Sequence, residues 1–401
     1  MTTSIIITLC ILVLIAYLFD ITAPKTKIPS IILLLVLGFG LKYFVSFLNF
    51  ELPDIQNILP LLGTIGLILI VLEGSLELDL EKEKLPLIAK SSLIAFFPIL
   101  ILSFLLAYSF NHFFAISYKI ALVNAIPLSI ISSAIAIPSA KHLSKTNKQF
   151  VTYESSLSDI FGVVFFNFIV LNSKINAKAF LDFVVEIIVM LFVSIVSTII
   201  LSIFLAKFKH HIKFIPIIIS IVLIYAISKV FHLPSLIFVL LFGITLSNLD
   251  QLKKYKIIER INPEVLEVEI HKFAFITTEF AFLVRALFFL LFGFLAEVDD
   301  VINLETLPWA LGTVLGIFLI RFVFLKLFKL PTSPLLFIAP RGLITILLFL
   351  SIPAEQKFNL VNNSLLIQTI LICALVMMFG MMTTKKAKNE VEVVDESTDL
   401  F

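Results

Sequence analysis

A short polar stretch interrupts a long apolar segment of this sequence, and it carries two carboxylates. Residues 153–162 read Tyr-Glu-Ser-Ser-Leu-Ser-Asp-Ile-Phe-Gly, and the chain then continues apolar. On a helix, Glu154 and Ser158 share a face because they are four residues apart. The same spacing relates Ser155 to Asp159. Carboxylate and hydroxyl oxygens suit hard cations, and a carboxylate can instead hold a proton. The strip therefore predicts a site at which a monovalent cation and a proton compete.

The composition indicates that this strip lies in a membrane. Of the 401 residues, 60% are apolar and only 14% are charged, whereas soluble domains average about 45–50% and about 25%. This composition excludes a soluble enzyme or a nucleic-acid-binding protein, and it predicts a polytopic membrane protein because a spanning helix needs about 20 apolar residues. Cys10 and Cys373 both lie in apolar runs, which argues against a disulfide framework.

Charged and turn-forming clusters divide the chain into segments long enough to cross a bilayer. We predict thirteen spans, at about 4–19, 28–49, 55–76, 85–110, 117–140, 150–172, 180–206, 214–231, 233–249, 271–296, 306–328, 332–353 and 363–384. Residues 1–384 then form one transmembrane domain, and residues 385–401 form a short polar tail.

Lysine and arginine are distributed unequally between the alternating loops. One set of loops holds 19 of them and the other set holds 6. Cytoplasmic loops carry the excess of positive charge. The asymmetry therefore predicts a multi-pass protein of the cell membrane, with its N-terminus outside and its C-terminal tail in the cytoplasm.

Two of the predicted spans carry helix breakers. The fifth span has Pro127 and Pro138 around the polar residues 129–133, and the twelfth has Pro340 and Gly342 around Arg341. Proline removes a backbone donor and clashes with the preceding turn. Interrupted helices at matching positions of two halves indicate a transporter with inverted repeats, although prolines can also merely kink membrane helices. We predict a first repeat at about 4–172, a connector at about 180–206 and a second repeat at about 214–384.

Charges within the spans need partners or functions, because a charge at mid-membrane costs at least about 2.5–3.5 kcal/mol. Asp159 lies several turns beyond Lys148 and so near mid-depth. Burial favours its neutral form, so a cation and a proton can compete for it. The alternative is a protonated Asp159 that only hydrogen-bonds a neighbouring helix. Arg341 stays charged and needs an anion, which Glu154 or Asp159 could supply.

Other intramembrane charges admit two interpretations. Arg321 and Arg285 could serve transport, or they could only pair helices or snorkel to the interface. Glu279 could line a cytoplasmic funnel or form a protonated hydrogen bond between helices. We keep Arg321 and Glu279 as secondary site candidates.

Several motifs resemble those of the monovalent cation/proton antiporter superfamily. Residues 154–162 are similar to its signature helix, which reads E-S-L-L-N-D-x-x-G in the sodium/proton exchanger, NhaP-like branch. Three more motifs have counterparts in the expected order. They are Glu73-Gly-Ser-Leu-Glu77-Leu-Asp79 (E-G-x-L-E-L-D), Phe288-Phe289-Leu-Leu-Phe-Gly293 (F-F-x-x-x-G) and Ala339-Pro340-Arg341-Gly342-Leu-Ile-Thr345 (G-L-R-G-x-x-x).

The resemblance implies an all-α, NhaA-like antiporter fold with a dimerisation bundle, a mobile core and two interrupted helices that cross at the ion site. It implies that Asp159 alternately binds cation and proton, and that Ser155 and Ser158 offer oxygens nearby. It also implies a homodimer and a structural ion pair between Glu154 and Arg341.

Two departures from the exchanger pattern concern the choice of ion. Ser158 replaces the usual Asn, and Ser132-Ser133-Ala134 stands where exchangers carry T-D-P. The latter is closer to the glutathione-gated potassium efflux (Kef-like) branch. We include Ser132 and Ser133 among the ion-binding residues. Because Asp159 then has no second aspartate beside it, we predict electroneutral exchange of one cation for one proton.

The leading functional hypothesis is secondary active Na⁺/H⁺ antiport that serves pH homeostasis, with Asp159 as a ligand of the transported Na⁺. K⁺ or Li⁺ as the cargo and a Kef-like K⁺ efflux protein remain alternatives. A membrane-embedded enzyme would need further clustered catalytic residues, which the sequence lacks. We expect neither an enzyme nor a resident cofactor, and no nucleic-acid partner.

Overall fold

The computed structural model describes residues 2–26, 28–47, 58–78, 80, 82–172, 176–207, 213–248 and 263–384. All regular secondary structure in these ranges is helical, which confirms the predicted all-α class. The predicted tail at 385–401 lies outside the described residues. The α-helices are α1 (Thr2–Thr26), α2 (Ser30–Phe47), α3 (Ile58–Leu76), α4 (Leu85–Phe114), α5 (Tyr118–Ser129), α6 (Ser133–Ser139), α7 (Lys145–Leu171), α8 (Ala177–Lys207), α9 (Phe214–Val230), α10 (Leu236–Ser247), α13 (Pro263–Leu295), α14 (Val298–Ile302), α15 (Leu307–Leu327), α16 (Leu343–Leu350) and α17 (Asn363–Thr383). The short 3₁₀ segments are η1 (Lys82–Lys84), η2 (Leu335–Phe337) and η3 (Ala354–Gln356).

The helices correspond to the predicted spans. Among the described residues, eight helical segments are long and apolar enough to cross a membrane, and four shorter apolar helices accompany them. The remaining predicted span, at 332–353, is divided between η2 and α16. Neither piece is long enough to cross a membrane, because the backbone leaves the helical conformation in the middle of the span.

Both predicted interruptions are present. The first is an extended stretch, Ile130 to Ser132, between α5 and α6. Pro127 and Pro138 lie inside the two half-helices, so the break falls on the polar residues between them. The second break runs from Ile338 to Gly342 and contains Pro340.

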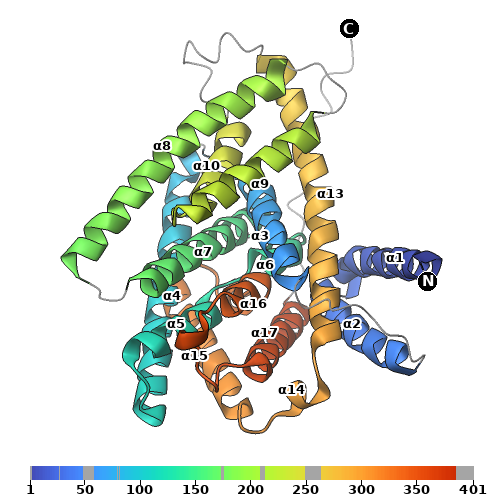
Figure 1. Ribbon diagram of the computed structural model, residues 1–401, viewed down its shortest axis with the longest axis vertical. Helices are drawn as coiled ribbons and strands as arrows, with labels where there is room; N and C mark the ends of the chain where they lie inside the picture. Colours follow the sequence, from blue (N-terminus) through green and yellow to red (C-terminus); the bar gives the residue numbers. More distant parts are fainter. Residues whose placement is uncertain are drawn as a thin grey trace.

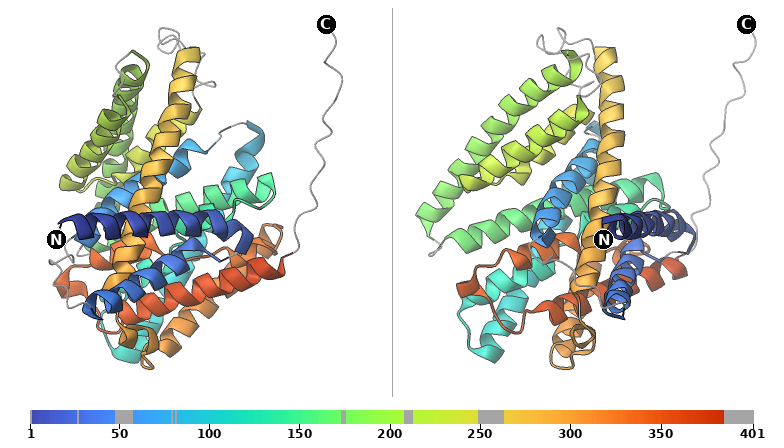
Figure 2. Two further views of the ribbon diagram at one scale, coloured as in Figure 1. Left: turned by 90° about the vertical axis from the view of Figure 1, so that its right-hand side faces the viewer. Right: turned by 45° about the vertical axis from the view of Figure 1, so that its right-hand side comes forward.

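The helices pack into two groups (Figure 1). The crossing bundle consists of α4–α7 and α14–α17, and the outer bundle consists of α1–α3, α8–α10 and α13. Within the outer bundle, α13 packs along α2 and α3 and runs most of the height of the molecule (Figure 2). The two bundles meet where α3 contacts α6, α7 and α16. This contact places the broken helices and the polar part of α7 in the interior.

Candidate ion-binding site

Asp159 lies on α7 where this helix passes the break between α5 and α6. Its side chain is buried, with 2% of the residue exposed. The backbone N–H of Ser133 donates to Oδ2 of Asp159 at 3.3 Å, and the Ser133 hydroxyl donates to the same oxygen. Oδ1 makes no hydrogen bond with any described residue. One carboxylate oxygen is therefore held by the start of α6, and the other has no hydrogen-bond partner among the described residues.

The close approach of α7 to the first break depends on small and polar side chains. A Cβ atom at Gly162 would overlap the side chain of Ile130, so only glycine allows this distance. The backbone N–H of Ile131 donates to Oγ of Ser158 at 2.9 Å, which satisfies a buried donor that has no helical partner. Ser158 therefore holds the break against α7.

The two breaks also contact each other directly. The N–H of Ser132 donates to the carbonyl of Pro340 at 3.0 Å. A Cβ atom at Gly342 would lie 2.6 Å from Cδ1 of Ile135 and 3.2 Å from Oγ of Ser132. The interrupted helices thus cross next to Asp159, with the glycine at the point of closest approach.

The predicted serines differ in what they contact. As described above, the Ser133 hydroxyl donates to Asp159, and the Ser158 hydroxyl accepts a hydrogen bond from the N–H of Ile131 in the first break. The Ser155 hydroxyl donates to the carbonyl of Val151 at 2.7 Å, within α7. The buried hydroxyls of Ser132 and Thr345 make no hydrogen bond with the described residues. Thr345 closes the motif at residues 339–345, but it was not among the predicted site residues because that motif position accepts any residue type.

The predicted ion pair between Glu154 and Arg341 is wrong, because Glu154 pairs with Arg321 of α15. Nη2 of Arg321 donates to Oε2 of Glu154 at 2.9 Å, Nη1 donates to Oε1, and Nε donates to the carbonyl of Leu335 at 2.8 Å. Glu154 and Asp159 are five residues apart on α7, so their side chains point in directions that differ by about 140° around the helix axis. Its carboxylate therefore faces α15 and not the crossing.

Arg341 donates to three backbone carbonyls, two of them at the end of α5, and to no carboxylate among the described residues. Its guanidinium donates to the carbonyls of Leu128 at 3.0 Å, Ser129 at 3.3 Å and Ala339 at 3.0 Å. Leu128 and Ser129 are the last residues of α5, whose final carbonyls lack intrahelical donors and carry partial negative charge. The buried cation thus caps α5 at the break.

The remaining candidate charges lie elsewhere. Arg285 of α13 pairs with Glu73 of α3, with Nη1 3.7 Å from Oε2, inside the outer bundle. Glu279 is exposed on α13 and forms no hydrogen bond or ion pair with the described residues, so the structure does not bring it to the site. Sequence reasoning missed the Glu73–Arg285 pair because composition shows that both charges need partners without showing which helices adjoin.

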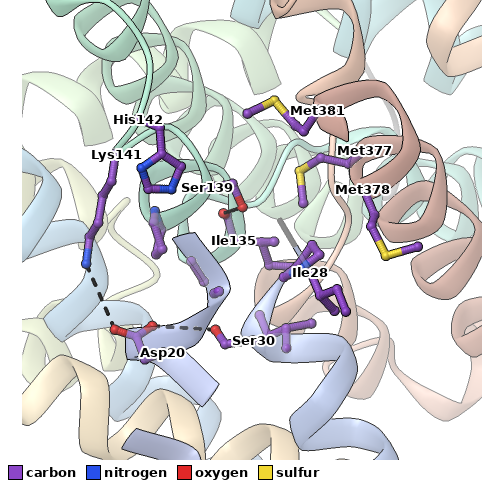
Figure 3. A pocket seen from close by; sticks show the side chains of 15 residues that line it. Asp20, Ile28, Ser30, Ile135, Ser139, Lys141, His142, Met377, Met378 and Met381 are labelled. Carbon is purple, nitrogen blue, oxygen red and sulfur yellow. Dashed lines mark hydrogen bonds and ion pairs between the residues drawn. The ribbon is translucent and has the colours of Figure 1, made fainter. Parts of the chain in front are cut away.

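A pocket lies beside α6, between the two bundles (Figure 3). Asp20 of α1, Ser30 of α2 and Met377 of α17 contribute to its lining, together with Ala134 of α6. Asp20 accepts a hydrogen bond from the Ser30 hydroxyl at 3.5 Å and lies 4.0 Å from Nζ of Lys141. Since Ala134 directly follows Ser133, this pocket approaches the Asp159 site from the side on which we predict the cytoplasm.

A second hollow lies toward the opposite end of α7. Asn167 of α7, Asp182 and Glu186 of α8, and His232 contribute to its lining. Asn167 is two turns beyond Asp159, or about 12 Å along the helix. The site therefore lies between two hollows, one toward each end of α7.

Comparisons with known proteins agree with this geometry. The model of the family described as "Sodium/hydrogen exchanger, transmembrane" matches residues 10–386. Two structures of the sodium proton antiporter MjNhaP1 from Methanocaldococcus jannaschii share the fold. The first, determined at pH 8, has a TM-score of 0.70 and 20% identity over 95% of this chain and 98% of that chain. The second, from electron microscopy, has a TM-score of 0.68 and 19% identity over 97% of this chain and 99% of that chain.

The search of curated proteins finds no match. The family model nevertheless covers nearly the whole chain, including both broken helices and α7. The chain belongs to the sodium/hydrogen exchanger family.

Proposed function

We propose that this protein exchanges one Na⁺ for one H⁺ across the membrane, and that Asp159 alternately holds the two ions. The observation that carries the proposal is the state of Asp159. It is a buried carboxyl that contacts no basic side chain among the described residues and has one oxygen without a hydrogen bond. An unpaired buried carboxylate is costly, so a proton or a cation must neutralise it.

The stoichiometry follows from the charges around the crossing. Glu154 is already neutralised by Arg321, and Arg341 is engaged by carbonyls. Among the described charges at the crossing, Asp159 alone is left to change its charge as the cargo changes. Replacing one H⁺ by one Na⁺ leaves the charge of the site unaltered, so each cycle moves no net charge.

The candidate ligands for the cation are oxygens close to the crossing. Oδ1 of Asp159 is the anionic one, and the Ser132 hydroxyl adds a neutral oxygen beside the second break. Protonation removes the negative charge of Asp159 and with it the main attraction for Na⁺. The ions therefore bind in competition, which couples their movements.

Alternating access requires that the site open to one side at a time. The hollow beside α6 and the hollow at the far end of α7 both lie between the bundles. We propose that movement of the crossing bundle against the outer bundle connects Asp159 to each hollow in turn. The Glu154–Arg321 pair and the Arg341 cap lie within the crossing bundle, so they can keep its shape while it moves.

The test is proton efflux from proteoliposomes that contain a pH-sensitive dye, measured on addition of Na⁺, Li⁺ or K⁺. We expect Na⁺ to release protons from wild-type vesicles, and Asp159→Asn to abolish this release for every cation. Clamping the membrane potential should leave the rate unchanged. Equal release by wild type and Asp159→Asn would overturn the proposal.

K⁺ is the second candidate cargo, because Ser132 and Ser133 provide hydroxyls where exchangers carry an aspartate. Proton release with K⁺ and not with Na⁺ in the same assay would select it. A rate that depends on the membrane potential would contradict the one-for-one stoichiometry while leaving the antiport itself intact.

A further inference from the structure

An apolar groove lies between the two bundles, away from Asp159 and toward the side that we predict to be outside the cell. It has a volume of about 330 Å³ and is lined only by apolar side chains and one glycine. Helices α2 and α13 form its outer-bundle wall, and α14 and α17 form the other. This volume falls in the range of ligand pockets, about 300–1,000 Å³.

The groove opens toward the lipid-facing surface. Val36 on α2 is 61% exposed and Ile302 at the end of α14 is 62% exposed, although both line it. Tyr43, one turn beyond Phe39, is also exposed. Tyrosine is enriched at the membrane–water interface. These residues indicate a slot that begins at headgroup level and continues among the acyl chains.

The rim of the groove carries charges of both signs. Nζ of Lys42 donates to the carbonyl of Ala296 at 3.0 Å and lies 3.5 Å from Oε1 of Glu297. An ammonium has three N–H donors. Two of those of Lys42 are used by Ala296 and Glu297, so the third can donate to a phosphate oxygen. Glu297 and Asp299 are exposed acids on either side of Val298, which lines the groove. A cation beside two acids complements a headgroup whose phosphate is followed by an ammonium.

We propose that this groove binds an acyl chain of one phosphatidylethanolamine molecule, with its phosphate at Lys42 and its ammonium at Glu297 and Asp299. The headgroup of a purely anionic lipid would be repelled by Glu297 and Asp299. A choline headgroup has no N–H to donate to them. Because the bound chain contacts both bundles, it lies where the two bundles would slide past each other.

Native mass spectrometry of the purified full-length protein tests the proposal. We expect wild type to retain one phosphatidylethanolamine per chain in preference to phosphatidylcholine with the same acyl chains. Val36→Trp should fill the groove and lower this retention about tenfold, since most of the buried apolar area of the chain is lost. Leu319→Trp is the matched control, because Leu319 is 59% exposed on α15 and lies outside the groove.

Two further measurements keep the test independent of any single variant. Glu297→Gln with Asp299→Asn should abolish the preference for ethanolamine over choline. Phosphatidylethanolamine with a photoreactive acyl chain should crosslink to peptides of the four helices that line the groove, α2, α13, α14 and α17. Equal retention by Val36→Trp and Leu319→Trp, equal retention of the two headgroups by wild type, crosslinks confined to other helices, or a protein dimer that covers the groove without lipid would each overturn the proposal.

Discussion

The pairing of Glu154 with Arg321 gives a prediction whose size can be worked out from the contacts. The Arg321 guanidinium makes two charge-assisted hydrogen bonds to Glu154, and both side chains are buried. Such bonds contribute about 1.5–3 kcal/mol each, and removing one partner of a buried ion pair costs about 3–5 kcal/mol. We therefore expect Arg321→Met to lower the free energy of unfolding by about 3–5 kcal/mol.

Most of that loss comes from the unpaired carboxylate, so neutralising Glu154 should restore stability. In the double variant Arg321→Met with Glu154→Gln, we expect recovery of about 2 kcal/mol or more, because coupling between contacting residues reaches about 0.5–3 kcal/mol. The assay is reversible unfolding of the purified protein in mixed detergent micelles. The matched cycle uses Arg341→Met, and there Glu154→Gln should restore nothing.

The reasoning would be refuted by the reverse result. If Glu154→Gln rescued Arg341→Met and did not rescue Arg321→Met, the carboxylate would be balancing Arg341 across the crossing. Proton transport by each variant provides a second readout, and the rescued double variant should keep Na⁺-driven proton release because Asp159 is untouched.

Three further outcomes follow from the crossing. Gly162→Ala should overlap the side chain of Ile130 and cost about 1–3 kcal/mol of stability, with partial rescue by Ile130→Ala in the same unfolding assay. Ser132→Ala should raise the KM for Na⁺ about tenfold through the loss of one oxygen ligand, while Ser139→Ala, at the end of α6, should leave it unchanged; equal effects would contradict a ligand role for Ser132. Arg341→Gln should abolish transport in proteoliposomes while the protein still assembles, and unaltered transport would show that α5 needs no cationic cap.

Much of the architecture was predictable because it depends on local composition. Apolar runs of spanning length specify the helices, and the polar residues 129–133 together with Pro340 and Gly342 indicate where two of them break. The spacing of Glu154, Ser155, Ser158 and Asp159 placed them on one helix without any tertiary information. Each of these properties follows from neighbours in the sequence, where the helical repeat fixes the geometry.

The partners of the buried charges could not be predicted in the same way. Composition showed that Glu154, Arg321 and Arg341 each needed compensation, but three charges on three helices allow more than one pairing. The structure resolves the pairing because Arg341 donates to the carbonyls at the end of α5. The sequence does not distinguish these carbonyls from those of any other residue. Glu154 is then left to Arg321.

The sequence by itself therefore determined that this chain is a bundle of membrane helices with two broken spans and a carboxyl within one of the spans, since these depend on hydrophobic length, helix-breaking residues and helical spacing. Only the tertiary structure decided that Ser133 holds Asp159, that Arg321 neutralises Glu154 and that Arg341 caps α5. These contacts join residues far apart in the chain, and they form because a buried polar group takes whichever partner the packing of the helices brings within reach.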